Sequence, residues 1–214
     1  MSALRFSSLI ILFPILFGAC GRSELIRIRM LAPVTEDKKD HAIFTDTESL
    51  SSFTPVITNK QIGGSLYFLF KSIGLGYTTI TTKMEKADEN LTEKTTLVTN
   101  FADVAFGIGE NYSFMWGAGV LTGGKWETSL EYDSKTFNPK HNYLGGHSLF
   151  FVLGHHGFGF ETLLGYRTNS IKAEFEEINP SDEDIGKTGK DFTYESNIIS
   201  LKTSQVQLGI GFTF

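Results

Sequence analysis

The chain has little of what stabilises or interrupts many folds. Its single cysteine, Cys20, excludes an internal disulfide. Prolines number only five, and helical periodicity is hard to find beyond the first twenty residues, so strands are favoured over helices. No Lys/Arg-rich stretch occurs and the formal net charge is −5, which argues against a nucleic-acid partner. The apolar run 9–17 is too short to cross a bilayer as a helix.

The amino terminus carries the pattern of a secretory signal peptide over residues 1–20. Arg5 precedes the apolar run, and a cluster of small residues follows it. Gly18-Ala19-Cys20 resembles a lipobox, in which Cys20 would be lipidated. Ala19-Cys20-Gly21 also satisfies the small-x-small rule, with cleavage after Gly21. Both cleavage sites stay open, and residues 21–214 are expected to form one domain.

What the chain does have is glycine and phenylalanine, 22 and 19 residues, spread along short alternating runs. In the run 206–214 every even residue is apolar and every odd one is polar or glycine, which predicts one strand with two chemically distinct faces. The phase continues back to Phe192, so 192–214 is predicted to be a single long strand. Ile26 to Met30 alternates in the same way and supplies a first strand.

The alternating segments are separated by connections of two lengths. Short connections are predicted at 71–72, 109–111 and 155–157, and long ones at about 33–60, 84–94, 133–143 and 176–191. The sequence therefore predicts an all-β, eight-stranded, antiparallel up-and-down barrel with every tight turn at one end. The expected strands are 24–32, 61–70, 73–83, 96–108, 112–132, 144–154, 158–173 and 192–214.

The two faces of these strands predict a transmembrane barrel. The apolar phase is expected to contact lipid, and a stretch of about 10 residues would cover the apolar band. Lys202 would then lie at the outer headgroup level, and the fifth strand would project beyond the membrane with Trp126 still in its outward phase. The residues expected to contact lipid are Ile26, Ile28, Met30, Leu66, Phe68, Phe70, Ile73, Leu75, Tyr77, Val104, Phe106, Ile108, Tyr112, Phe114, Trp116, Ala118, Val120, Phe158, Phe160, Leu164, Tyr166 and the even residues of 206–214.

The terminal strand, with Phe212 and Phe214 on its apolar face, resembles the last strand of small bacterial outer-membrane β-barrels of the OmpA/OmpX type. In that class such an ending is the insertion signal for the barrel-assembly machinery. The resemblance implies the outer membrane of a Gram-negative-type bacterium, with both termini periplasmic and the long loops extracellular. It also implies contact with outer-membrane lipid and lipopolysaccharide.

The opposite, inward phase carries charges that form the candidate site. Charges at membrane depth are costly unless paired, so Arg27 or Arg29 is expected to meet Glu161 or Asp103 inside the barrel. We expect these ion pairs to plug so narrow a lumen; the alternative is a gate or a narrow ion path. The five inward charges are Arg27, Arg29, Asp103, Glu161 and Arg167.

Neither catalysis nor a cofactor is expected. His147 and Ser148 are adjacent in a strand and would lie on opposite sides of the sheet, so they cannot pair. His155-His156 is interpreted as part of a polar turn, because no further metal-ligand spacing surrounds it. The long loops hold most of the net charge, in 33–60, in 84–94 with Glu85, Asp88, Glu89 and Glu93, and in 174–191.

Three hypotheses follow. The main one is a non-enzymatic outer-membrane barrel with a plugged lumen, whose acidic surface loops bind an extracellular ligand or mediate adhesion. The second is a narrow pore or small-solute transporter. The third is a lipoprotein anchored through Cys20, with a soluble lipocalin-like barrel that encloses an apolar ligand, in which case the apolar face would point inward.

Overall fold

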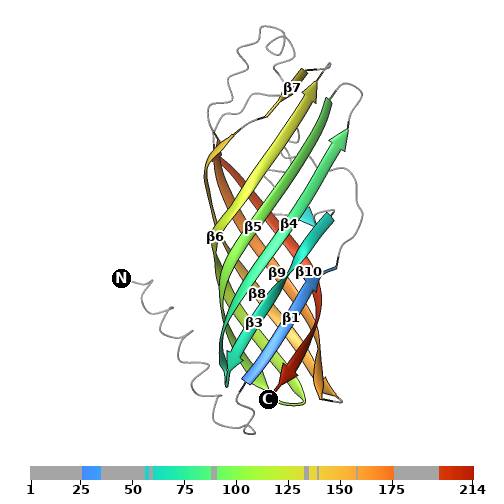
Figure 1. Cartoon of the computed structure of the whole chain (residues 1–214), viewed down its shortest axis with the longest axis vertical. Helices are drawn as coiled ribbons and strands as arrows, with labels where there is room; N and C mark the ends of the chain where they lie inside the picture. Colours follow the sequence, from blue (N-terminus) through green and yellow to red (C-terminus); the bar gives the residue numbers. More distant parts are fainter. Residues whose placement is uncertain are drawn as a thin grey trace, which may run out of the picture.

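The computed structural model describes residues 26–34, 56–57, 60–87, 91–132, 135–138, 140–157, 159–175 and 198–214. Eight strands form a closed antiparallel barrel, because β1 pairs with both β3 and β10 (Figure 1), which confirms the predicted fold class. The barrel strands are β1 (Ile26–Pro33), β3 (Lys60–Phe70), β4 (Ile73–Ala87), β5 (Leu91–Gly109), β6 (Tyr112–Tyr132), β8 (His141–Gly157), β9 (Phe160–Phe175) and β10 (Ile198–Thr213).

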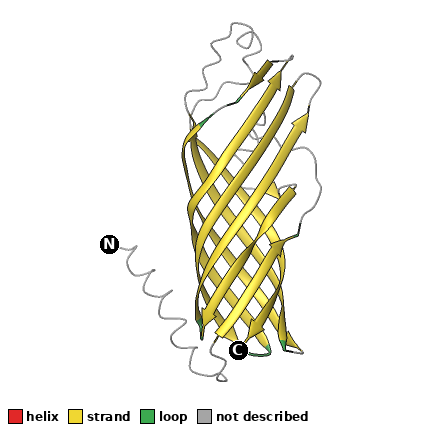
Figure 2. Ribbon diagram, viewed as in Figure 1, coloured by secondary structure: helices red, strands yellow, loops and turns green. Residues whose placement is uncertain are grey.

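Two short strands lie outside this ring. β2 (Val56–Ile57) pairs in parallel with β10, and β7 (Lys135–Phe137) pairs with β6; neither was predicted. Figure 2 shows strands and turns but no helix in the described part of the chain. None of the residues described there forms a helix long and apolar enough to cross a membrane.

The tight turns lie together at one end of the barrel, as predicted. The turns at Lys71-Ser72 and Glu110-Asn111 connect β3 to β4 and β5 to β6. The third turn is displaced from the prediction. His155, His156 and Gly157 continue β8, and the chain reverses at Gly159, whose φ of 86° is left-handed and suits glycine. Phe158 lies outside the described residues.

β4, β5 and β8 are longer than predicted, and the loop predicted between β4 and β5 is largely absent. β4 and β5 remain paired through Ala87 and Thr92, so most of 84–94 is a hairpin rather than a loop. Glu85 and Glu93, expected on the same surface loop, lie on opposite faces of this hairpin, and Glu93 is buried. The single long terminal strand is confirmed over Ile198–Thr213, and Glu174, expected in the acidic loop 174–191, lies in β9 instead. The segments 35–55, 88–90 and 176–197 and the signal peptide fall outside the described residues.

Apolar side chains cover the outside of the barrel nearest the tight turns. We call this part the lower half; it reaches Tyr77 on β4, Val104 on β5, Val120 on β6 and Val206 on β10. The expected outward residues that are exposed here include Leu66, Phe68, Phe70, Ile73, Leu75, Tyr77, Val104, Tyr112, Phe114, Val120, Phe160, Leu164, Val206, Leu208, Ile210 and Phe212. Their neighbours in each strand point inward and are mostly polar or small.

The arrangement reverses in the rest of the strands, which we call the upper half. There the outward side chains are mainly hydroxyls, lysines and glutamates, whereas the interior holds an apolar cluster. Figure 1 shows β4, β5 and β6 extending farthest at this end. The cluster contains Met84, Leu97, Phe101, Trp126, Ile171, Ala173, Phe175, Ile199 and Leu201.

Trp126 was predicted to point outward and instead lies inside, 2% exposed. The cause is a β-bulge in β6. Phe101 pairs with Leu121 and Asn100 with Gly123, so Thr122 is an extra residue outside the register, and its hydroxyl donates to the Asn100 carbonyl at 3.2 Å. One extra residue exchanges the two faces of a strand. The even residues of β6 therefore point outward below Thr122 and inward above it.

Candidate functional site: two ion-pair layers inside the barrel

The first ion-pair layer crosses the interior near the tight turns. Arg29 on β1 donates from Nε and Nη2 to the two carboxylate oxygens of Glu161 on β9, each at 2.8 Å. Ser113 accepts from Arg29 Nη2 at 2.7 Å and donates to Glu161 Oε1 at 3.1 Å. Arg27 lies beside them, with Nη1 3.9 Å from Glu161 Oε1 and Nη2 donating to the Gly109 carbonyl at 2.7 Å. The carboxylate is thus bound by one arginine and flanked by a second.

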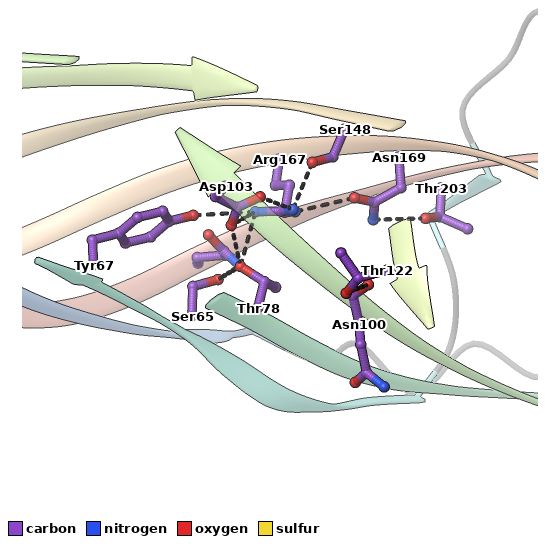
Figure 3. A network of polar contacts seen from close by, with 11 residues as sticks. Ser65, Tyr67, Thr78, Asn100, Asp103, Thr122, Ser148, Arg167, Asn169 and Thr203 are labelled. Atoms are coloured by element: carbon purple, nitrogen blue, oxygen red, sulfur yellow. Dashed lines mark hydrogen bonds and ion pairs between the residues drawn. The ribbon is translucent and has the colours of Figure 1, made fainter. Parts of the chain in front are cut away.

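The second layer lies farther up and is centred on Arg167 and Asp103 (Figure 3). Arg167 donates from Nη1 and Nη2 to the two oxygens of Asp103, at 2.9 and 2.8 Å. Both side chains are fully buried. The guanidinium also lies over the rings of Phe101 and Phe150, with its central carbon 4.9 and 5.3 Å from the ring centroids. Planar, two-point pairing of this kind is the strongest arginine–carboxylate geometry.

Hydroxyl and amide groups complete the hydrogen bonding of this second pair. Arg167 donates further to Tyr67, Ser148 and Asn169, at 3.1, 2.6 and 3.1 Å. Thr78 donates to Asp103 Oδ2 at 2.6 Å. These groups belong to five strands, β3, β4, β5, β8 and β9, and Figure 3 shows them converging on the ion pair. The contacts therefore connect the barrel wall across its lumen. Buried charges are tolerated when their donors and acceptors are satisfied in this way.

A glycine makes room for each ion pair. A Cβ on Gly119 would overlap Oδ1 of Asp103, and one on Gly211 would lie 2.6 Å from Oε2 of Glu161. The interior of an eight-stranded barrel is only wide enough for side chains, so small residues on the inward phase are needed beside each pair. Neither glycine has a positive φ, so the requirement is space rather than backbone conformation.

An apolar cluster fills the lumen between the two layers. On β9, for example, Leu163 lies between Glu161 and Arg167. From the tight turns upward, the interior therefore holds the first ion-pair layer, this apolar cluster, the second ion-pair layer and then the apolar cluster of the upper half. The cluster comprises Leu31, Tyr67, Leu69, Ala105, Met115, Phe150, Val152 and Leu163.

All five predicted charges lie inside the barrel, but in two separate groups. Arg29 meets Glu161 as expected, whereas Asp103 is paired with Arg167 and contacts neither arginine of β1. A signal for this division was available in the sequence. Arg29 and Glu161 lie near the tight-turn ends of their strands, while Asp103 and Arg167 lie several residues deeper.

Sequence reasoning missed the uncharged members of the site. Ser113, Thr78, Tyr67 and Asn169 occupy the same inward phase as the charges, and that phase was their signal. Ser148 points inward and accepts a hydrogen bond from Arg167, while its neighbour His147 is exposed outside. Within the described ranges, no group of three or more His, Cys, Asp or Glu residues is arranged to hold a metal ion.

The terminal aromatic residues lie where the barrel closes. Phe212 and Phe214 point outward, and the backbone of Phe214 exchanges two hydrogen bonds with Ile26 of β1, at 2.9 and 3.2 Å. Their role as an insertion signal stays a prediction. Cys20, the possible lipidation site, lies outside the described residues.

The fold and interior together define a closed, eight-stranded antiparallel β-barrel, consistent with a barrel of the OmpA/OmpX type. No protein-family model matches the chain, and no curated protein is significantly similar to it.

Proposed function

We propose that the chain is an integral outer-membrane β-barrel protein that is not an enzyme, and that it presents its extracellular segments for binding or adhesion. The observation that carries this proposal is the outward apolar surface of the lower half around a polar, charged interior. A soluble barrel would have the reverse arrangement, since exposed apolar surface is unfavourable in water. The lipocalin-like alternative needs an apolar cavity at this level, where two ion-pair layers and the small apolar cluster between them occupy the interior.

The length of the apolar surface supports the membrane assignment. It extends from Tyr112 to Val120 on β6 and from Val206 to Phe214 on β10. A tilted transmembrane strand needs about 9–11 residues. Both runs match one crossing. The aromatic residues Phe70, Tyr112, Phe160 and Phe212 recur near the tight turns, where the periplasmic interface would lie.

The filled lumen favours a scaffold over a channel. Two ion-pair layers with an apolar cluster between them leave the interior occupied by side chains. Eight-stranded barrels have interiors only wide enough for such filling. In this proposal the barrel-assembly machinery inserts the chain, lipid and lipopolysaccharide surround it, and the segments at the upper end meet the extracellular ligand.

A narrow pore is a second candidate, favoured by one observation. Several polar atoms that point into the lumen from β1 and β10 have no hydrogen-bond partner, namely Arg29 Nη1, both amide atoms of Gln205, Gln207 Oε1 and Thr213 Oγ1. Buried polar atoms of this kind are normally satisfied by water. A file of water beside β10 would be the start of a conduction path.

Two measurements test the proposal. Carbonate washing of membranes from cells that express the full chain should leave it in the pellet, with proteolysis of intact cells cleaving only the extracellular segments. Release by carbonate would overturn the membrane assignment. Planar bilayers holding the purified chain should show no stable openings, and openings that change with Glu161→Gln would replace the scaffold by the pore.

A further inference from the structure

A ring of lysines surrounds the outside of the barrel just above its apolar surface. Six strands contribute one exposed lysine each, and on β10 only Ser204 separates Lys202 from the last outward apolar residue, Val206, in the outward phase. The chain as a whole is acidic, so this accumulation runs against its composition. We call this ring the lysine belt; it consists of Lys60, Lys83, Lys94, Lys125, Lys172 and Lys202.

Two members of the belt are placed where like charges repel. Lys60 and Lys83 are direct cross-strand partners, and both side chains point outward. Among the described residues neither has a carboxylate within ion-pair distance. Like charges directly opposite each other destabilise a sheet. An anion bound between the two ammonium groups would remove that repulsion.

The belt also borders a cleft. β6 and β8 are paired only up to Val120 and His147, and beyond this point they separate. A cleft of about 530 Å³ opens between them. Lys94 and Lys125 of the belt line it together with Lys140 from the segment before β8, and Thr128, Ser129 and Asn138 add hydrogen-bonding groups. The cleft thus brings three ammonium groups to one side of the barrel.

Existing ion pairs do not neutralise this cleft. Lys94 lies 3.7 Å from Glu85, and Lys125 is paired with Glu127, but all four side chains are more than half exposed. Such surface pairs contribute little and are readily exchanged for a more strongly charged partner. No carboxylate among the described residues pairs with Lys140. The cleft is lined by three lysines and one carboxylate, that of Glu127, so the net charge of its lining is positive.

We infer that the lysine belt binds the phosphate groups of phosphorylated lipids in the outer leaflet, and that the cleft between β6 and β8 is its strongest site. The inference rests on the proposed membrane location. A belt that runs around the barrel, directly above surface that would contact acyl chains, matches anions that surround the protein on all sides. Lysine stems can lie along the apolar surface while their ammonium groups reach the headgroups.

Binding can be measured on the purified full chain, refolded in nanodiscs of a zwitterionic lipid. Bisphosphorylated lipid A and the same lipid without phosphates are then titrated separately, with native mass spectrometry as the readout. The test variant is Lys94→Gln/Lys125→Gln/Lys140→Gln. Lys71→Gln at the opposite, tight-turn end is the matched control for Lys140→Gln alone, because both residues are exposed lysines.

The wild-type chain should prefer the phosphorylated lipid. The triple variant should bind it roughly 10- to 100-fold more weakly and Lys140→Gln roughly fivefold more weakly, while Lys71→Gln changes nothing. A triple Lys→Arg variant should retain binding, since charge is preserved. Equal binding of the two lipids, equal loss in Lys71→Gln, or displacement by inorganic phosphate at comparable concentration would overturn the inference.

The outcome separates this inference from the proposed function. Chains that resist carbonate extraction but show no phosphate preference would refute the lysine belt as a lipid site and leave the membrane assignment intact. A chain that cannot be incorporated into nanodiscs at all would refute both. Retained heat-modifiable migration of each variant establishes that the barrel has folded before binding is compared.

Discussion

The two halves of the barrel differ in which side chains point outward and which point inward. In the lower half, large apolar side chains point outward, and the interior holds two charged pairs with a small apolar cluster between them. In the upper half, lysines, glutamates and hydroxyls point outward and an apolar cluster that includes Trp126 and Phe175 fills the interior. The same strands run through both, so the difference does not come from secondary structure. It reflects what lies outside the wall at each level: lipid below, in our proposal, and water above.

The strands cross this boundary by two different means. On β10 the inward phase simply changes chemistry, from Gln205 and Gln207 below to Ile199 and Leu201 above. On β6 the outward apolar residues of the lower half have even numbers, and Trp126 in the upper half has an even number too. Unbroken alternation would therefore point Trp126 outward. The extra residue Thr122 exchanges the faces at the boundary. A bulge here therefore allows one strand to serve both environments.

The largest effect is expected from deleting Thr122. Without it, unbroken alternation would turn Trp126 outward and place Lys125 and Glu127 in the apolar interior. The upper half should lose its ordered core while the lower half still closes. Acrylamide quenching of Trp126 in a Trp116→Phe background should rise strongly. Substitution of Thr122 by Ser, which keeps the residue count, is the control; unchanged quenching after the deletion would contradict the bulge as the cause.

A smaller but still large effect is expected in the lower half from Arg167→Met. The carboxylate of Asp103 would remain buried without its cation, which costs about 3–5 kcal/mol of unfolding free energy. Adding Asp103→Leu should recover most of the loss, since apolar groups of similar volume can replace a buried pair. Denaturant unfolding of the refolded chain measures both. If the double variant were as unstable as Arg167→Met, the surrounding packing and not the unpaired charge would be responsible.

Lysine scanning of one outward phase tests whether the halves have different surroundings. Ile210 and Ser200 both point outward on β10, one in each half. Ile210→Lys should cost about 2–4 kcal/mol in a bilayer, because it lies at the centre of the apolar run, and Ser200→Lys only about 0–1 kcal/mol. Unfolding in lipid vesicles gives the two values. Similar small costs at both positions would mean that water surrounds the lower half as well.

The same contrast explains how much of the fold could be predicted. In the lower half, alternation between apolar and polar residues is strong, so the eight strands, their antiparallel order and the unbroken β10 followed from it. In the upper half both phases contain polar residues, and Glu93 points inward. Polarity there predicts a loop over 84–94, whereas β4 and β5 remain paired through Ala87 and Thr92. The bulge could not be placed from the sequence, because Thr122 is not distinguished there from its neighbours Leu121 and Gly123.

The charged residues of the site could be predicted from the sequence, but the contacts between them could be predicted only in part. Inward phase and charge identified Arg29, Asp103, Glu161 and Arg167, because these follow from local alternation. The distance of each charge from the tight turns separates the two groups, but the exact contacts depend on the register of strands far apart in the chain, which is fixed when β1 closes on β10. The hydroxyl partners are no different in sequence from surface threonines and serines, so only the closed barrel identifies them.

The smallest effect concerns two glycines of β6 on either side of the bulge. Gly119 lies beside Asp103 and Ser148, and its added Cβ would be 2.7 Å from the Ser148 hydroxyl oxygen and would overlap the carboxylate. Gly119→Ala should therefore disturb the two-point pairing with Arg167 and cost about 1–3 kcal/mol. At Gly123 the nearest atom is Asn100 Nδ2, 3.9 Å away, so Gly123→Ala should stay within about 0.5 kcal/mol of the wild type. Parallel denaturant titrations compare them, and equal losses would mean that backbone freedom, rather than space for the ion pair, is what β6 requires of its glycines.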